Sequence, residues 1–242
     1  MHRDLEGPED GPAVVCLHGG IGTGRYHWSR QIDALAADHR VHLLDLPGHG
    51  GTPLAEGDEY SYATLADAIE AYLAELDHPA HVLGFSMGGH AALRVAARRP
   101  GLFASLVLVG VALWEHPEFD TWRERFDPDR LEREYPAWAR ALAKLHAPLG
   151  PDAWRDVLVR DAGGQLAVDA DLGALAGFDV PVLLVRGDRD PVVPAPQYAE
   201  LREVWPHADE FVVPHGGHDV QLTRHGLVRP VLLDFLDRAK EV

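Results

Sequence analysis

The sequence contains one cysteine and only two lysines, and it has no apolar stretch long enough to cross a membrane. A single cysteine, Cys16, rules out a disulfide within the chain, as is typical of proteins in a reducing compartment. The longest apolar stretch spans about residues 102–114, whereas a membrane-spanning helix needs about 20 residues. The first residues lack the apolar segment of a signal peptide. These absences predict a cytoplasmic protein with no membrane partner.

Basic side chains are also scarce, since 22 of them stand against 38 acidic ones and give a formal net charge of −16. That charge repels polyanions, and the basic residues form no stripe, so nucleic acid is disfavoured as a partner. With 46% hydrophobic and 25% charged residues, the composition is that of a folded globular protein and not of a disordered chain. The 242 residues fit one domain, or one domain with a sizeable insertion.

Short apolar runs alternate with longer, Ala-rich helical patterns over most of the chain. This alternation predicts an α/β fold, in which a mostly parallel, twisted sheet is flanked by helices. Strands buried on both faces are expected to be almost continuously apolar, as these runs are. The six expected strands lie at 14–17, 41–46, 81–85, 105–110, 180–186 and 210–213. The five expected helices lie at 28–37, 61–76, 87–98, 195–204 and 227–240.

The alternation is interrupted once, over residues 114–171. No strand pattern occurs there, and five prolines separate short helical pieces. Four of the six tryptophans also fall in this segment. We therefore expect 114–171 to be a helical cap inserted into a core formed by residues 1–113 and 172–242.

One short motif carries chemistry. Gly84-Phe85-Ser86-Met87-Gly88 matches the pattern G-x-S-x-G between an expected strand and an expected helix. In that setting a sharp turn exposes the serine hydroxyl at the sheet edge, and the small residues on either side let the helix pack closely. The helix N-terminus also supplies N–H groups that have no partner within the helix.

With this motif the chain resembles the α/β-hydrolase family. The resemblance covers about residues 13–110 and 178–238, in the family's order and spacing. Besides the serine motif, the segments that carry it are Leu17-His18-Gly19-Gly20, Asp45-Leu46-Pro47-Gly48-His49-Gly50, Pro181 to Asp190, and Val213-Pro214-His215-Gly216-Gly217-His218.

The resemblance implies a Ser-His-Asp catalytic triad. Ser86 would be the nucleophile and His218 the general base that takes its proton. Asp190 would orient His218 and stabilise its protonated form. The backbone N–H groups of Met87 and Gly20 would form the oxyanion hole.

The acid of the triad has two rivals and the base has one. Asp188 stands two residues before Asp190, and Glu115 follows the strand after which some members of the family place the acid. His215 competes with His218, although the Gly-Gly-His pattern favours the latter. The two histidines also have the spacing of metal ligands, but no cysteine or acidic cluster accompanies them, so no metal is expected.

No organic cofactor is expected either. The glycine-rich stretch 20–24 follows a strand, but Arg25 breaks the G-x-G-x-x-G pattern of dinucleotide-binding proteins. The chain also differs from most of its family at the N-terminus, because only about a dozen residues precede the first expected strand. We therefore expect the usual N-terminal antiparallel hairpin to be missing and the sheet to have about six strands.

These patterns predict a serine hydrolase that cleaves an ester, lactone or thioester of a small-molecule substrate. Aromatic residues of the cap are expected to bind it, and these are Trp114, Phe119, Trp122 and Trp138. The cap holds 13 acidic against 8 basic residues, which favours neutral or apolar substrates over anionic ones. Two alternatives use the same fold, namely a C–C bond hydrolase or lyase with this triad, and a non-catalytic binding protein. The expected assembly is a monomer or a homodimer.

Overall fold

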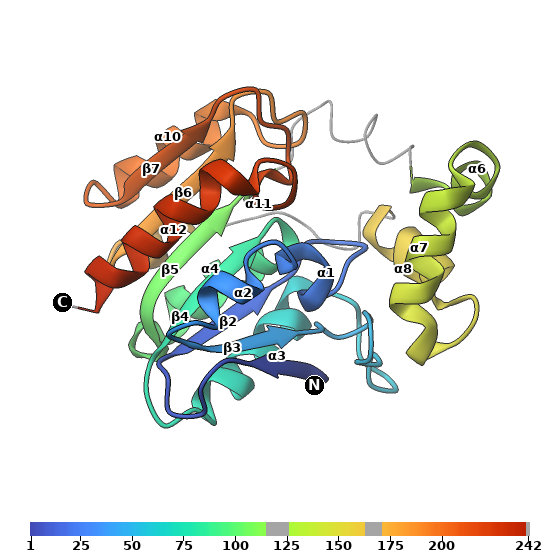
Figure 1. Ribbon diagram of the computed structural model, residues 1–242, viewed down its shortest axis with the longest axis horizontal. Coiled ribbons are helices and arrows are strands. Elements are labelled where there is room, and N and C mark those ends of the chain that lie inside the picture. Colours follow the sequence, from blue (N-terminus) through green and yellow to red (C-terminus); the bar gives the residue numbers. More distant parts are fainter. Residues whose placement is uncertain (115–125, 163–170, 241–242) are drawn as a thin grey trace.

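The computed structural model describes residues 1–114, 126–162 and 171–240. A seven-stranded twisted sheet forms its centre, with strand order β1-β3-β2-β4-β5-β6-β7 (Figure 1). All neighbouring pairs are parallel except β1 and β3. The strands are β1 (Arg3–Glu6), β2 (Ala13–Leu17), β3 (Arg40–Leu44), β4 (Ala80–Phe85), β5 (Phe103–Val109), β6 (Val182–Gly187) and β7 (Asp209–Val213). The predicted α/β class and all six expected strands are confirmed.

Helices cover both faces of the sheet (Figure 1). One face packs against α3 (Tyr62–Ala74), α4 (Met87–Arg98), α9 (Leu172–Leu175) and α10 (Ala195–Val204). The other face packs against α1 (Gly24–Trp28), α2 (Ile32–Leu35), α11 (Val220–Thr223) and α12 (His225–Ala239). Two apolar clusters result, one on each side of the sheet, and they explain why the central strands are apolar on both faces.

The sheet has one strand more than the sequence suggested. Arg3–Glu6 pairs antiparallel with β3, from Arg3 opposite Leu44 to Glu6 opposite Val41. This edge strand has only one apolar residue, Leu5, and its binding to the sheet comes from backbone hydrogen bonds instead of burial. We expected about six strands and no N-terminal hairpin. The structure has a seventh strand at this edge, and it is a single antiparallel strand.

The expected helix at 28–37 is wrong in its bounds, since two short helices, α1 and α2, occupy this region. Thr23 caps α1 by accepting a hydrogen bond from Tyr26 N. The Trp28 indole is fully buried and donates to Leu17 O at 3.1 Å, which ends α1 against the sheet. By contrast, α3 begins as predicted, with the Ser61 hydroxyl accepting from Thr64 N.

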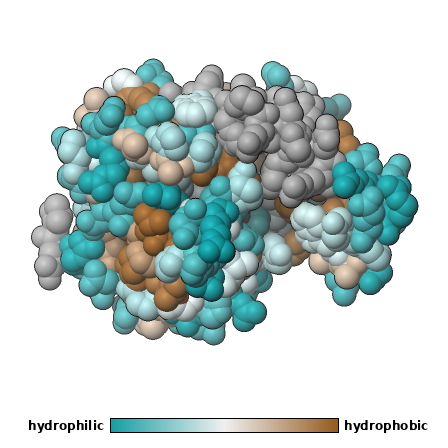
Figure 2. Space-filling view, turned by 90° about the horizontal axis from the view of Figure 1, so that it is seen from above, coloured by the Kyte–Doolittle hydropathy of each residue, from teal (hydrophilic) through white to brown (hydrophobic). Residues whose placement is uncertain are grey.

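Between β5 and β6 lie the insertion helices, by which we mean α6 (Pro128–Glu134), α7 (Pro136–His146) and α8 (Ala153–Ala162). They share a small apolar core of their own, which includes Leu131, Leu142 and Leu158. The space-filling view shows them as a lobe whose visible surface is mostly hydrophilic (Figure 2). The boundaries 113/114 and 171/172 stay a prediction, because residues 115–125 and 163–170 lie outside the described residues. Within the described ranges, no helix is long and apolar enough to cross a membrane.

Two strands of the sheet each carry a buried histidine side chain. His42 in β3 contacts the Tyr72 hydroxyl at 2.6 Å, and His81 in β4 contacts the Ser105 hydroxyl at 2.8 Å. Burial is the main reason that the pKa of each ring is lowered to about 4. Both rings are therefore neutral in the folded protein at pH values where an exposed histidine would be protonated.

We expect this to make the fold sensitive to mild acid. Unfolding lets each ring bind up to about one proton between pH 6.5 and pH 4, so the free energy of unfolding falls as the pH is lowered through this window. Urea unfolding at several pH values measures the slope. The double variant His42→Gln, His81→Gln should have a shallower slope than the wild type, whereas the exposed control His78→Gln should not. Equal slopes in all three proteins would contradict this account.

Candidate active site

Four loops at one edge of the sheet carry the residues that the sequence singles out. Gly20 follows β2, Ser86 follows β4, Asp190 follows β6 and His218 follows β7. The carboxyl ends of parallel strands lie at the same edge, which is where α/β proteins place their sites. The fold thus collects side chains that are far apart in sequence.

Ser86 occupies the turn between β4 and α4 with φ 47° and ψ −117°. A positive φ is uncommon for a residue with a side chain, and such conformations persist only where the surroundings hold them. Backbone hydrogen bonds do so here, since Ser86 N donates to Val109 O at 2.8 Å and Ser86 O accepts from His90 N at 3.0 Å. The turn presents the hydroxyl above the sheet edge.

Glycines make this turn sterically possible. A Cβ on Gly84 would lie 2.5 Å from the Cα of Gly89, so β4 and α4 meet backbone to backbone. A Cβ on Gly88 would lie 2.5 Å from His18 O, to which Gly88 N donates at 3.0 Å. The requirement for small residues on either side of the serine follows directly from these distances.

Ser86, His218 and Asp190 form a hydrogen-bonded chain. The His218 Nε2 atom lies 3.0 Å from Ser86 Oγ, and its Nδ1 atom lies 2.9 Å from Asp190 Oδ2. Asp190 is an acceptor only, so Nδ1 carries the ring proton and Nε2 is left to accept from the serine hydroxyl. This is the tautomer that a general base needs.

The Asp190 carboxylate is held in place as a charge. Its side chain is 1% exposed, and its Oδ1 atom accepts hydrogen bonds from Val192 N and Val193 N at 2.8 and 3.1 Å. Burial alone would raise the pKa of this carboxyl, but the charge and hydrogen bond of His218 and these two N–H groups lower it below the ordinary value. Asp190 is therefore ionised throughout the neutral range.

The two rivals that lie in the described residues have other contacts. Asp188 is exposed, and its Oδ1 atom accepts from Gly216 N at 3.1 Å, as a turn-forming carboxylate does. His215 sits in the turn after β7 with φ 54°, and the ring that contacts the Ser86 hydroxyl is that of His218. The third rival, Glu115, lies outside the described residues.

The loop after β2 lies against the serine turn. A Cβ on Gly19 would be 2.8 Å from the Phe85 ring and 3.2 Å from Ser86 Cβ, so only glycine fits there. Gly20 follows on this loop, and Met87 begins α4, where a backbone N–H has no intrahelical acceptor. The two residues expected to supply N–H groups thus sit on two segments that touch at Ser86.

The expected aromatic residues fall into two groups. Phe119 and Trp122 lie outside the described residues. The Trp114 indole donates to Glu200 Oε1 at 3.0 Å, and the Trp138 ring packs against Phe126 with ring centroids 6.1 Å apart. These contacts are within the protein, and a role of the four side chains in binding substrate stays a prediction.

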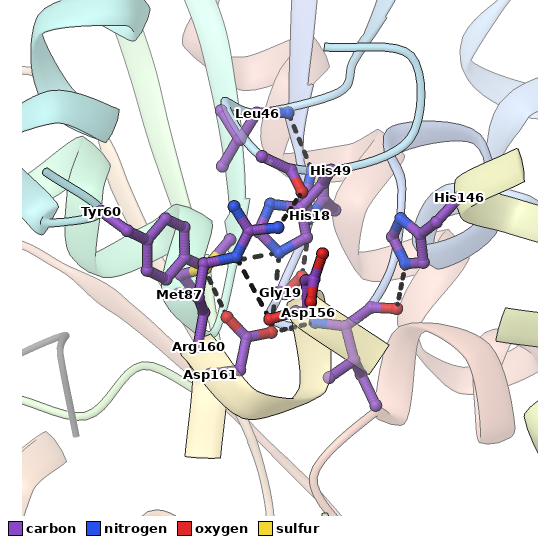
Figure 3. Close-up of polar contacts among 12 residues, drawn as sticks. His18, Gly19, Leu46, His49, Tyr60, Met87, His146, Asp156, Arg160 and Asp161 are labelled. Atoms are coloured by element: carbon purple, nitrogen blue, oxygen red, sulfur yellow. Dashed lines mark hydrogen bonds and ion pairs between the residues drawn. The ribbon is translucent and has the colours of Figure 1, made fainter. Parts of the chain in front are cut away.

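Three polar residues at this edge were not expected from the sequence. Asp161 and His146 come from the insertion helices and bind the loop after β2, and Tyr60, from the loop before α3, donates to Asp161 (Figure 3). None belongs to a motif, and Asp161 is one of 13 acidic residues in segment 114–171. Across the described part of the chain, no group of three or more His, Cys, Asp or Glu side chains is arranged to hold a metal ion.

Comparisons with known proteins identify the family of the chain. A model of the alpha/beta hydrolase family matches residues 14–230. Among curated relatives, "Putative carbamate hydrolase RutD" of Variovorax paradoxus is 31% identical and aligns with 98% of this chain and 96% of its own length. A pimeloyl-(acyl-carrier protein) methyl ester esterase of Aeromonas hydrophila is 32% identical over 90% of this chain and 92% of its own.

Solved structures have the same fold. The 2-hydroxy-6-oxo-6-phenylhexa-2,4-dienoate hydrolase of Rhodococcus sp. strain RHA1 superposes with a TM-score of 0.82 at 21% identity, covering 98% of this chain and 94% of that one. At this identity the similarity concerns the fold alone. The family model spans most of the sequence, and the chain therefore belongs to the alpha/beta hydrolase family.

Proposed function

We propose that this protein is a serine hydrolase that cleaves an ester, lactone or thioester through an acyl-enzyme. One observation carries the proposal, namely the hydrogen-bonded chain from Ser86 Oγ through His218 to Asp190. A hydroxyl, a correctly tautomerised imidazole and a buried carboxylate in this order are the parts needed to activate a serine. A protein that only binds a ligand has no need of all three.

The geometry supports the following steps. Ser86 Oγ attacks the substrate carbonyl carbon while His218 Nε2 takes its proton, and Asp190 stabilises the protonated ring. The carbonyl oxygen becomes an oxyanion, which the N–H groups of Met87 and Gly20 stabilise. His218 then returns the proton to the leaving group, and an acyl group remains on Ser86. Water, deprotonated by His218, releases this acyl group in the second half of the reaction.

The names of the curated relatives support carbonyl substrates of this kind. One name specifies a carbamate and another a methyl ester, and both carry a carbonyl carbon bonded to a leaving group. A C–C bond hydrolase remains the second candidate, because solved structures with this fold include hydrolases of dienoate compounds. A panel of esters, thioesters, lactones and carbamates, run beside dienoate and diketone substrates whose C–C bond would be cleaved, separates the two candidates.

The insertion supports a preference for neutral or apolar substrates. We propose that segment 114–171 is a cap over the site, because α7 and α8 contact the loops after β2 and β3. Its 13 acidic and 8 basic residues give the segment a share of the chain's net charge of −16, and this negative charge repels anions at the entrance.

The charge preference has a direct test. At low salt, kcat/KM should be higher for a neutral aryl ester than for an analogue with two carboxylates in its acyl chain, and the gap should narrow as salt screens the field. A preference for the dianionic ester at low salt would contradict the proposed substrate class.

Removing the nucleophile tests the reaction itself. In Ser86→Ala, turnover of p-nitrophenyl esters should fall by at least about 10⁴-fold, because no oxygen remains to form the acyl-enzyme. The exposed Ser29→Ala variant is the matched control and should keep wild-type rates. A fluorophosphonate should add its mass to the wild type and to Ser29→Ala but not to Ser86→Ala. Wild-type rates in Ser86→Ala would refute the proposal.

The same Asp-to-Asn substitution at positions 190 and 188 tests which of the two carboxylates is the acid of the triad. Asp190→Asn should lower kcat by about 10³- to 10⁴-fold, because an amide at this position favours the wrong His218 tautomer and removes the stabilising charge. Asp188→Asn, two residues away and exposed, should change kcat by less than about threefold. The reverse pattern would make Asp188 the acid of the triad.

A further inference from the structure

The insertion helices hold one peptide segment of the loop after β2 from both sides. Ile21 N donates to Asp161 Oδ2 of α8 at 2.5 Å, and Ile21 O accepts from His146 Nε2 of α7 at 3.0 Å. Ile21 directly follows Gly20, which is the proposed oxyanion-hole residue on this loop. Both backbone polar groups of Ile21 are thus bound by side chains from the insertion.

The loop needs such support. Ile21 has φ 55°, a left-handed conformation that is strongly disfavoured for a β-branched residue. Its chain neighbours Gly20 and Gly22 have no side chains that could fix them by packing. The conformation therefore depends on contacts from outside the loop.

His146 is suited to this task in its neutral form. Its Nδ1 atom accepts from Gly50 N at 3.0 Å, so the ring proton is on Nε2, where it is donated to Ile21 O. Burial lowers the pKa of this ring and keeps it neutral. His146 thereby joins the loop after β2 to the loop after β3.

Asp161 lies beside Gly20 and is linked through Tyr60 to the side chain of Met87. Its side chain is 10% exposed, and its Oδ1 atom accepts from the Tyr60 hydroxyl at 2.5 Å. That hydroxyl also lies 3.2 Å from the sulfur of Met87, the other proposed oxyanion-hole residue. On the Gly20 side, a Cβ on Gly20 would lie 2.9 Å from Asp161 Oδ2.

We propose that Asp161 is a positioning residue, through which the seated insertion sets the oxyanion hole. The proposal rests on the proposed function, since it assigns Gly20 and Met87 to that hole. Anchoring of the insertion alone does not require this arrangement, because Arg160 already fastens α8 to the core through Gly48 O at 3.3 Å and the Tyr60 ring. Asp161 instead binds the backbone next to the reacting centre.

The negative charge of Asp161 and its hydrogen bonds have opposite effects on the stability of the oxyanion. Burial alone would raise the pKa of the Asp161 carboxyl, but the His49 ring 3.6 Å away and the hydrogen bonds from Tyr60 and Ile21 N lower it, so the carboxyl is ionised. A negative charge near the hole opposes a developing oxyanion, whereas its hydrogen bonds position the N–H group that stabilises it. We propose that positioning is the larger effect, and substitutions that differ in charge and in hydrogen bonding separate the two.

Three variants test the proposal. Asp161→Ala loses the hydrogen bonds from Ile21 N and the Tyr60 hydroxyl, Asp161→Asn loses the charge but keeps an oxygen for Ile21 N, and Asp129→Asn is the control on the exposed surface of α6. We expect kcat for an aryl ester to fall by about 10- to 100-fold in Asp161→Ala and about fivefold in Asp161→Asn, with KM within about twofold, since the hole acts in the transition state. Asp129→Asn should match the wild type.

A second readout separates positioning from loss of structure. A trifluoromethyl ketone that adds to Ser86 places its own oxyanion in the hole, so its inhibition constant should rise in parallel with the loss of kcat. Melting temperatures are measured alongside, and if Asp161→Ala does not fold, Asp161→Asn carries the test. Unchanged kcat, a faster Asp161→Asn enzyme, or a lower kcat with an unchanged inhibition constant would each overturn the positioning role. If Ser86→Ala stays active, the proposed function itself fails, which is a different result.

Discussion

The close approach of β4 and α4 at Ser86 is the constraint on which the site depends. Only glycine fits at positions 84, 88 and 89, because any Cβ there would collide with backbone or with a buried side chain. This packing permits the left-handed conformation of Ser86, and it draws the loop after β2 against the serine through the bond from Gly88 N to His18 O. One steric arrangement thus places the hydroxyl and brings two candidate oxyanion donors to it.

Charges and hydrogen bonds determine the protonation state of the histidine rings at this site. The His218 ring lies between a buried, ionised carboxylate and a neutral hydroxyl, and the carboxylate fixes which ring nitrogen carries the proton. Around the loop after β2, the buried His18 and His146 rings each accept a backbone N–H from the loop after β3, so both are bound in the neutral form. Burial lowers the pKa of both rings, which keeps these contacts intact at neutral pH.

Local sequence patterns predicted the parts of the fold that depend on local chemistry. Apolar runs located the six expected strands, and the G-x-S-x-G turn located Ser86, because each has a steric or hydrophobic requirement visible within a few residues. Strand β1 was not predicted, because it is held by backbone pairing and is little buried, so its sequence has no apolar run. The single helix expected at 28–37 is interrupted where Trp28 is fixed to the sheet, a tertiary contact. Asp161 was missed because its partner Ile21 is 140 residues away in sequence.

The central claim is that Ser86 forms a tetrahedral adduct whose oxyanion is bound by two backbone N–H groups. A crystal structure of the trifluoromethyl ketone adduct tests it most directly. We predict a covalent bond from Ser86 Oγ to the ketone carbon, with the oxyanion about 2.7–3.1 Å from both Met87 N and Gly20 N. An adduct on another residue, or an oxyanion directed away from both N–H groups, would contradict the account.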